Sequence, residues 1–126
     1  MNRLTKRLAD LKKQNKKALV AYLVAGDPDI ESTLQLMNLF VESGVDVLEI
    51  GVPFTDPIAE GPIIQKAHDR ALEKNISLTA IFEMVQKFRE TDDTTPIVLM
   101  GYLNTFLSHK KIIEENKKDS VDSILV

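Results

Sequence analysis

A glutamate inside an apolar segment is the first residue whose type and position indicate chemistry. Glu49 lies in residues 45–50, where alternation places it on one face of a predicted strand with Val45 and Val47. A carboxylate on a buried strand is costly unless it is paired, protonated or used. In parallel α/β folds the carboxyl ends of the strands carry the active site. We therefore interpret Glu49 as a candidate acid–base residue, with structural pairing to a basic side chain as the alternative.

The loop after this strand brings two further carboxylates to the same place. Residues 51–62 contain three prolines and two glycines, together with Asp56 and Glu60. Such a loop has a stiffly held shape, and a rigid loop at a strand's carboxyl end suits substrate positioning. Solvated acids on a structural turn are the alternative.

The tyrosines and histidines are less specific. Tyr22 and Tyr102 each lie near the carboxyl end of a predicted strand, where they either pack in the core or line a flat aromatic substrate. His68 falls in the middle of a predicted helix and His109 on a polar stretch, so we interpret both as surface or packing residues. Because the two histidines are isolated from other ligand types, we predict no metal site.

The elements that position these residues alternate along the chain. Helical periodicity predicts helices over residues 2–14, 63–73 and 103–117, one helix capped by Asp27 and ended by Gly44, and one opened by Ser77 or Thr79. Apolar runs predict strands over residues 18–24, 45–50, 97–100 and 121–126. Strands that alternate with helices imply a parallel sheet with right-handed crossovers.

This order predicts an α/β fold in which residues 1–126 form a single domain, the N-terminal half of a (β/α)8 TIM barrel. The first four βα units would follow an N-terminal helix, and a whole barrel needs about 250 residues. A complete four-stranded doubly wound domain is the alternative, but residues 123–126 end in an apolar strand without a covering helix. We expect an isolated chain of this kind to be nearly inactive, or to associate with itself through the open edges of its outer strands.

Composition excludes several classes of function. The net charge of -3 gives no electrostatic basis for binding nucleic acid. Cysteine is absent, which excludes disulfides and thiolate sites. No apolar run reaches the roughly 18 residues of a membrane span, and the N-terminus lacks the apolar core of a signal peptide. We therefore expect a cytoplasmic protein that does not bind membranes.

A long motif resembles one family. Residues 48–65, LEIGVPFTDPIAEGPIIQ, resemble the signature L-E-[LI]-G-[VI]-P-[FY]-[ST]-D-P-x-A-[DE]-G-P-x-I-Q of the tryptophan synthase alpha chain family. Residues 26–28 and 100–104 resemble the turns after the family's first and third strands. The likeness covers the whole chain but only the first half of a family member. It implies a lyase of tryptophan biosynthesis that cleaves indole-3-glycerol phosphate to indole and glyceraldehyde 3-phosphate by a retro-aldol reaction.

The resemblance also implies roles for single residues. Glu49 matches the catalytic glutamate, which moves a proton to indole C3 and takes one from the glycerol hydroxyl. Glu60 matches the second catalytic carboxylate, which holds the indole N–H; the family usually has Asp there, and Glu is one methylene longer. Tyr22 and Tyr102 match positions that line the indole pocket, the first of which is often Phe.

Partners and cofactors follow from the same resemblance. Pro53, Asp56 and Pro57 match the loop that contacts the tryptophan synthase beta chain in an alpha2-beta2 heterotetramer. No cofactor is expected in this chain, because pyridoxal phosphate belongs to the beta partner. The phosphate site of such barrels is usually built after strands seven and eight, beyond these residues. A half-barrel that binds the beta chain without doing chemistry is therefore the alternative function.

Overall fold

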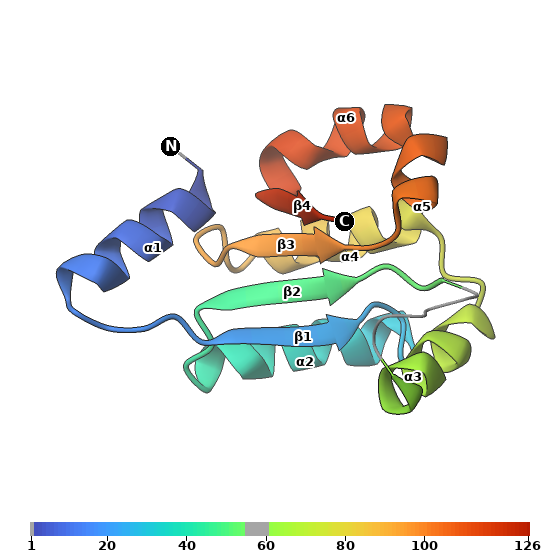
Figure 1. Cartoon of the computed structure of the whole chain (residues 1–126), viewed down its shortest axis with the longest axis horizontal. Coiled ribbons are helices and arrows are strands. Elements are labelled where there is room, and N and C mark those ends of the chain that lie inside the picture. Colours follow the sequence, from blue (N-terminus) through green and yellow to red (C-terminus); the bar gives the residue numbers. More distant parts are fainter. Residues whose placement is uncertain (1, 55–60) are drawn as a thin grey trace.

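The computed structural model describes residues 2–54 and 61–126, with the backbone alone for residues 117–119. Helices and strands alternate as predicted (Figure 1). The elements run in the order α1 (Arg3–Lys13), β1 (Val20–Val24), α2 (Ile30–Glu42), β2 (Val47–Gly51), α3 (Pro62–Leu72), α4 (Leu78–Arg89), β3 (Ile97–Met100), α5 (Leu103–Ser108), α6 (Lys110–Ser120) and β4 (Ser123–Leu125). None of the described helices is long and apolar enough to cross a membrane.

The strands form one parallel sheet in chain order, β1-β2-β3-β4. Its register aligns Tyr22 with Glu49, and Glu49 with Val98. Since neighbours in register point to the same face, these three side chains share one side of the sheet. β1 and β4 are the outer strands, and Val20 and Leu125 on them are 50% and 47% exposed.

The two faces of the sheet are covered unequally. One face is closed by α2 and α4, which lie behind the sheet in Figure 1, and by α6. Its strand residues form the main core with helix residues such as Met37, Ile81, Phe82, Phe88 and Ile113. The opposite face carries Tyr22 and Glu49, and α3 covers it beside β1 through Val24, Ala67 and Ala71. This second face therefore leaves space for a pocket next to α3, on the side that carries Glu49.

A buried charge network ties α1 to the amino ends of the strands. The Asp122 carboxylate, 2% exposed, pairs with Arg3 at 3.2 Å and Arg89 at 3.3 Å, and accepts the Ile97 N–H at 2.9 Å. Burial, followed by repulsion from Arg3, lowers the pKa of Arg89 to about 10. The network joins Arg3 near the start of the chain to Asp122 near its end. It lies at the amino ends of the strands, away from the carboxyl ends near which Glu49 lies.

The cap predicted for the second helix is wrong by two residues. Asp29, not Asp27, caps α2 by accepting the Ser32 N–H at 2.7 Å. Asp27 instead binds Arg70 of α3 through two hydrogen bonds of 2.6 and 3.0 Å. The predicted end of this helix is confirmed, because Gly44 follows the C-cap with a φ of +105° and donates to Val41.

The helix predicted over residues 103–117 is two helices. α5 ends at Ser108, and the backbone of His109 leaves the helical region (φ -125°, ψ 27°) before α6 begins. The Ser108 hydroxyl donates to the Asn104 carbonyl and the His109 ring bonds the Thr105 carbonyl, both at 2.8 Å. Side-chain bonds to carbonyls one turn back compete with a regular helix, which explains the break. The other predicted elements are present, and their ends differ from the predicted ones by at most two residues.

Candidate functional site at the carboxyl ends of the strands

A small cavity lies on the open face of the sheet, near the carboxyl ends of the first three strands. Its volume is about 180 Å³, and it is lined by Tyr22, Glu49, Ile64 and Met100. The two residues that sequence reasoning selected on β1 and β2 are thus brought together. A carboxylate and an aromatic ring in one mostly apolar cavity suit an aromatic ligand that undergoes proton transfer.

Glu49 occupies the third position of β2 and is the half-buried residue of an otherwise buried strand. Within the described part of the chain it forms no salt bridge, so the structural-pairing alternative finds no support there. Its carboxylate faces the cavity rather than a basic side chain. A carboxylate in such a place is available for acid–base chemistry.

Tyr22 reaches the cavity because Gly51 leaves room for it. A Cβ at Gly51 would lie 2.7 Å from Tyr22 Cζ and 3.1 Å from Cε2, with the hydroxyl oxygen closer still. Carbon atoms pack at about 3.5–4.0 Å, so any side chain here would displace the ring. Gly51 is therefore required for the position of Tyr22, which the motif alone does not explain.

His68 was not connected with this site by the sequence analysis. It is 1% exposed, and it bonds the Phe54 N–H through Nδ1 at 3.1 Å and the Tyr22 hydroxyl through Nε2 at 3.5 Å. It is thus a packing histidine, one of the two predicted possibilities. The signal was present in the helical stripe formed by residues 64, 67, 68 and 71, because this spacing turns position 68 inward.

The remaining described candidates lie beside the cavity rather than in its lining. The Tyr102 ring stacks on Phe54, with centroids 4.5 Å apart and planes at 25°. Pro53 is buried and lines a second hollow of about 380 Å³ with residues from the start of α4 and from α5 and α6. The indole contact predicted for Tyr102 and the partner contact predicted for Pro53 therefore stay predictions.

Three predicted site residues, Asp56, Pro57 and Glu60, lie outside the described residues. Their predicted roles stay predictions. Among the residues that the structure describes, there is no group of three or more histidine, cysteine or acidic side chains that could hold a metal ion.

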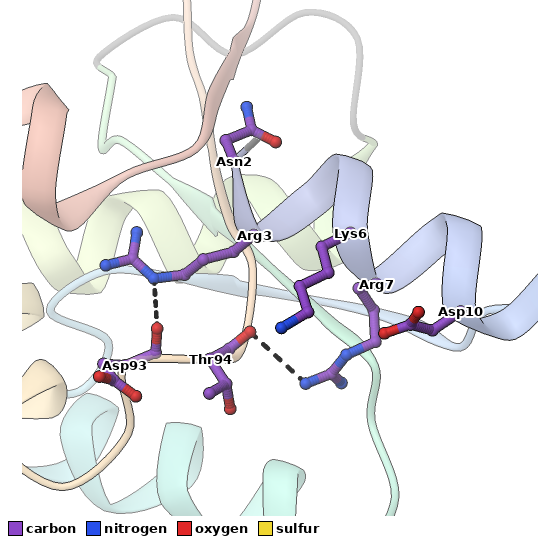
Figure 2. A pocket seen from close by; sticks show the side chains of 7 residues that line it. All are labelled: Asn2, Arg3, Lys6, Arg7, Asp10, Asp93 and Thr94. Atoms are coloured by element: carbon purple, nitrogen blue, oxygen red, sulfur yellow. Dashed lines mark hydrogen bonds between the residues drawn. The ribbon is translucent and has the colours of Figure 1, made fainter.

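A larger hollow, about 310 Å³, lies at the opposite end of the sheet between α1 and the turn before β3 (Figure 2). Its two arginine side chains already bind backbone carbonyls. Arg3 donates to the Asp93 carbonyl at 2.6 Å, and Arg7 donates to the Asp46 carbonyl at 3.2 Å and the Thr94 carbonyl at 3.5 Å. These bonds fasten α1 to the sheet, so we assign this hollow a structural role.

Comparison with known proteins agrees with the motif. A family model described as tryptophan synthase alpha chain matches residues 8–126. The tryptophan synthase alpha chain of Neisseria meningitidis serogroup B is 52% identical over 111 residues, which cover 86% of this chain and 42% of that protein. That of Leptothrix cholodnii is 46% identical and covers 100% of this chain and 47% of that protein. The chain spans about half the length of the curated relatives it matches.

Solved structures give the same result for the fold. Tryptophan synthase subunit alpha of Legionella pneumophila superposes with a TM-score of 0.94 at 46% identity, covering 100% of this chain and 49% of that one. A tryptophan synthase complex from Pyrococcus furiosus has a TM-score of 0.78 at 42% identity, covering 86% and 45%. The predicted fold class is confirmed, because the four parallel strands and their helices match about half of these TIM-barrel chains.

Proposed function

Because the chain belongs to the tryptophan synthase alpha chain family, we propose that the intact protein containing it is a carbon–carbon lyase. Its reaction is the retro-aldol cleavage of indole-3-glycerol phosphate to indole and glyceraldehyde 3-phosphate. The observation that carries the proposal is the pairing in register of Glu49 with Tyr22, in one cavity at the carboxyl ends of the strands. The family motif supports it at Glu49.

Glu49 is proposed as the general acid and base. Cleavage needs a proton at indole C3, which makes indole a leaving group, and removal of a proton from the glycerol hydroxyl. One carboxylate can do both steps in sequence, first as the acid and then as the base. The half-buried position of Glu49, away from described cations, supports this role.

The other proposed residues bind or stabilise the indole ring. Tyr22 gives the cavity an aromatic wall, and its position over Gly51 supports that role. Tyr102 is proposed to extend this wall through its stack on Phe54. Glu60 is proposed to hold the indole N–H and stabilise positive charge on the ring nitrogen, since a second ionised carboxylate would do so.

We further propose the tryptophan synthase beta chain as partner, with Pro53, Asp56 and Pro57 in the contact. The support is a neighbour described as an a2b2 complex, from Pyrococcus furiosus. No cofactor is proposed for this chain, and pyridoxal phosphate is assigned to the partner. A half-barrel that only binds the beta chain is the second candidate, because the chain spans about half of its relatives.

Glu49→Gln tests the proposal in the intact protein. Removing the proton-transfer group while keeping its shape should lower indole release by at least about 100-fold, while activation of the beta chain stays nearly unchanged. Glu83→Gln, an exposed residue of α4, is the matched control and should retain activity. Full lyase activity in Glu49→Gln would show that the base is another residue. A wild-type protein that activates its partner but releases no indole would establish the binding module instead.

A further inference from the structure

We propose that His68 is a positioning residue, which holds the aromatic wall of the cavity as a neutral imidazole with its hydrogen on Nε2. It joins Tyr22 on β1 to Phe54 in the segment after β2, and through them sets the wall against which a flat aromatic ring packs. That the ring is indole rests on the proposed function. His68 is thus proposed to act through Tyr22 and Phe54 and not as an acid or base.

The hydrogen bonds determine the tautomer. The Phe54 N–H can only donate, so Nδ1 accepts it and carries no hydrogen. In the neutral ring the hydrogen then sits on Nε2, from which it points to the Tyr22 hydroxyl oxygen 3.5 Å away. If Nδ1 were protonated, its N–H would face the Phe54 N–H, and two donors cannot form a hydrogen bond with each other. The arrangement therefore requires the neutral form of His68.

His68 connects otherwise separate parts of the wall. The hydroxyl of Tyr22 is held on one side by Nε2, and the ring rests over Gly51 on the other. Phe54 is held through its backbone, and its ring stacks on Tyr102. A single buried side chain thus restrains the aromatic groups from three strand ends, and a restrained wall loses less entropy when a ligand binds.

A purely apolar packing role does not account for these contacts. The neighbours of His68 on the inward stripe of α3 are Ile64, Ala67 and Ala71, and an apolar side chain would complete that stripe. It would leave the Phe54 N–H without its acceptor and Tyr22 without this donor. The expected result is a looser wall and weaker aromatic binding, in addition to any loss of stability.

The tautomer is tested directly by nitrogen NMR of the intact protein at neutral pH. The His68 resonances are assigned as those that a His68→Asn variant lacks and a His109→Asn variant retains. We expect His68 Nε2 to show the resonance of a protonated ring nitrogen and Nδ1 that of an unprotonated one. A hydrogen on Nδ1, in the neutral ring or in an imidazolium, would overturn the proposal.

The effect on the wall is tested by titration with indole. His68→Leu should weaken indole binding by about tenfold, since two hydrogen bonds that restrain the wall are lost. His68→Asn keeps an acceptor at the position of Nδ1 but does not reach Tyr22, so we expect a loss of about threefold. His109→Asn should bind indole like the wild type. If His68→Leu does not fold, two other variants test the positioning role. His68→Asn changes the side chain that bonds Phe54 and Tyr22, and Tyr22→Phe removes the hydroxyl that bonds His68 Nε2.

The outcomes separate this inference from the proposed function. Folded His68 variants that bind indole as tightly as the wild type would refute the positioning role, whatever the protein catalyses. A wild-type protein that binds indole in a His68-dependent way but releases none from indole-3-glycerol phosphate would refute the proposed lyase activity and leave the positioning role standing. A wild-type protein that does not bind indole would refute the assignment of the wall to an aromatic ring.

Discussion

Adding one methyl group at Gly51 should move Tyr22 and destabilise the fold. Gly51 is the last residue of β2, and a Cβ there would lie 2.7 Å from Tyr22 Cζ. Ordinary contact needs about 3.5–4.0 Å, so the ring must shift by roughly 1 Å. Inserting a methyl group into a filled space costs about 1–3 kcal/mol. We therefore expect Gly51→Ala to lower the free energy of unfolding by that amount.

Without the Tyr22 ring, Gly51→Ala should raise the free energy of unfolding instead of lowering it. In a Tyr22→Ala background the space is empty, and the backbone of Gly51 is not in the left-handed region. Alanine is then favoured over glycine within a strand by roughly 0.5–1 kcal/mol. The coupling between the two sites should be about 1.5–4 kcal/mol.

The assay is urea unfolding of the wild type, both single variants and the double variant. The chain has no tryptophan and two tyrosines, one of which is changed, so far-UV circular dichroism is the suitable signal. Equal m-values across the four proteins would show that the unfolding reaction is the same. If Gly51→Ala costs the same free energy with and without Tyr22, the ring does not lie over Gly51, and the reasoning about this wall is wrong.

Three further changes test other parts of the structure. Arg89→Met should lower the free energy of unfolding by about 3–5 kcal/mol, because it leaves buried Asp122 short of a partner; Arg70→Met, at an exposed ion pair, should have a much smaller effect in the same urea titration. Ser77→Ala should cost about 1 kcal/mol through loss of the α4 cap, which Ser77→Asn should preserve in thermal unfolding. Burial alone raises the pKa of Asp92, but hydrogen bonds from Thr95 and Thr94 outweigh it and lower the pKa below 3.8. Asp92 therefore stabilises the fold above that pH and loses its contribution as the pH falls through its folded pKa. Asp92→Asn should flatten the stability profile below about pH 4, and an unchanged acid slope would contradict this assignment.

Local patterns predicted well wherever one element's own period carried the signal. The alternation around Glu49 put it on the opposite face of β2 from Leu48 and Ile50, which lie in the main core, and the glycine stop after α2 is where the sequence indicated. Local patterns failed at the start of α2, where two nearby residues could both serve as the N-cap. Asp27 and Asp29 are both good caps by type, and the position of Arg70, 43 residues away, is what takes Asp27 out of that role.

At the site, too, local patterns selected some residues, and contacts between distant residues decided others. Strand position and the family resemblance selected Glu49 and Tyr22, and the parallel register brings them together as neighbours. The sequence did not indicate that His68 holds Tyr22, because that contact joins residues 46 positions apart on a helix and a strand. Nothing in the local pattern distinguishes a histidine that fills space from one that holds a wall.

The sequence by itself determined the family, the order of strands and helices, and the acid–base candidate, because those depend on residue type and short-range periodicity. The tertiary structure alone decided which side chains share a cavity, which arginines are occupied by carbonyls, and which tautomer His68 adopts. These features depend on the packing of α3 and α1 against the sheet. Packing of that kind is set by many distant contacts at once, and no single segment of the chain records it.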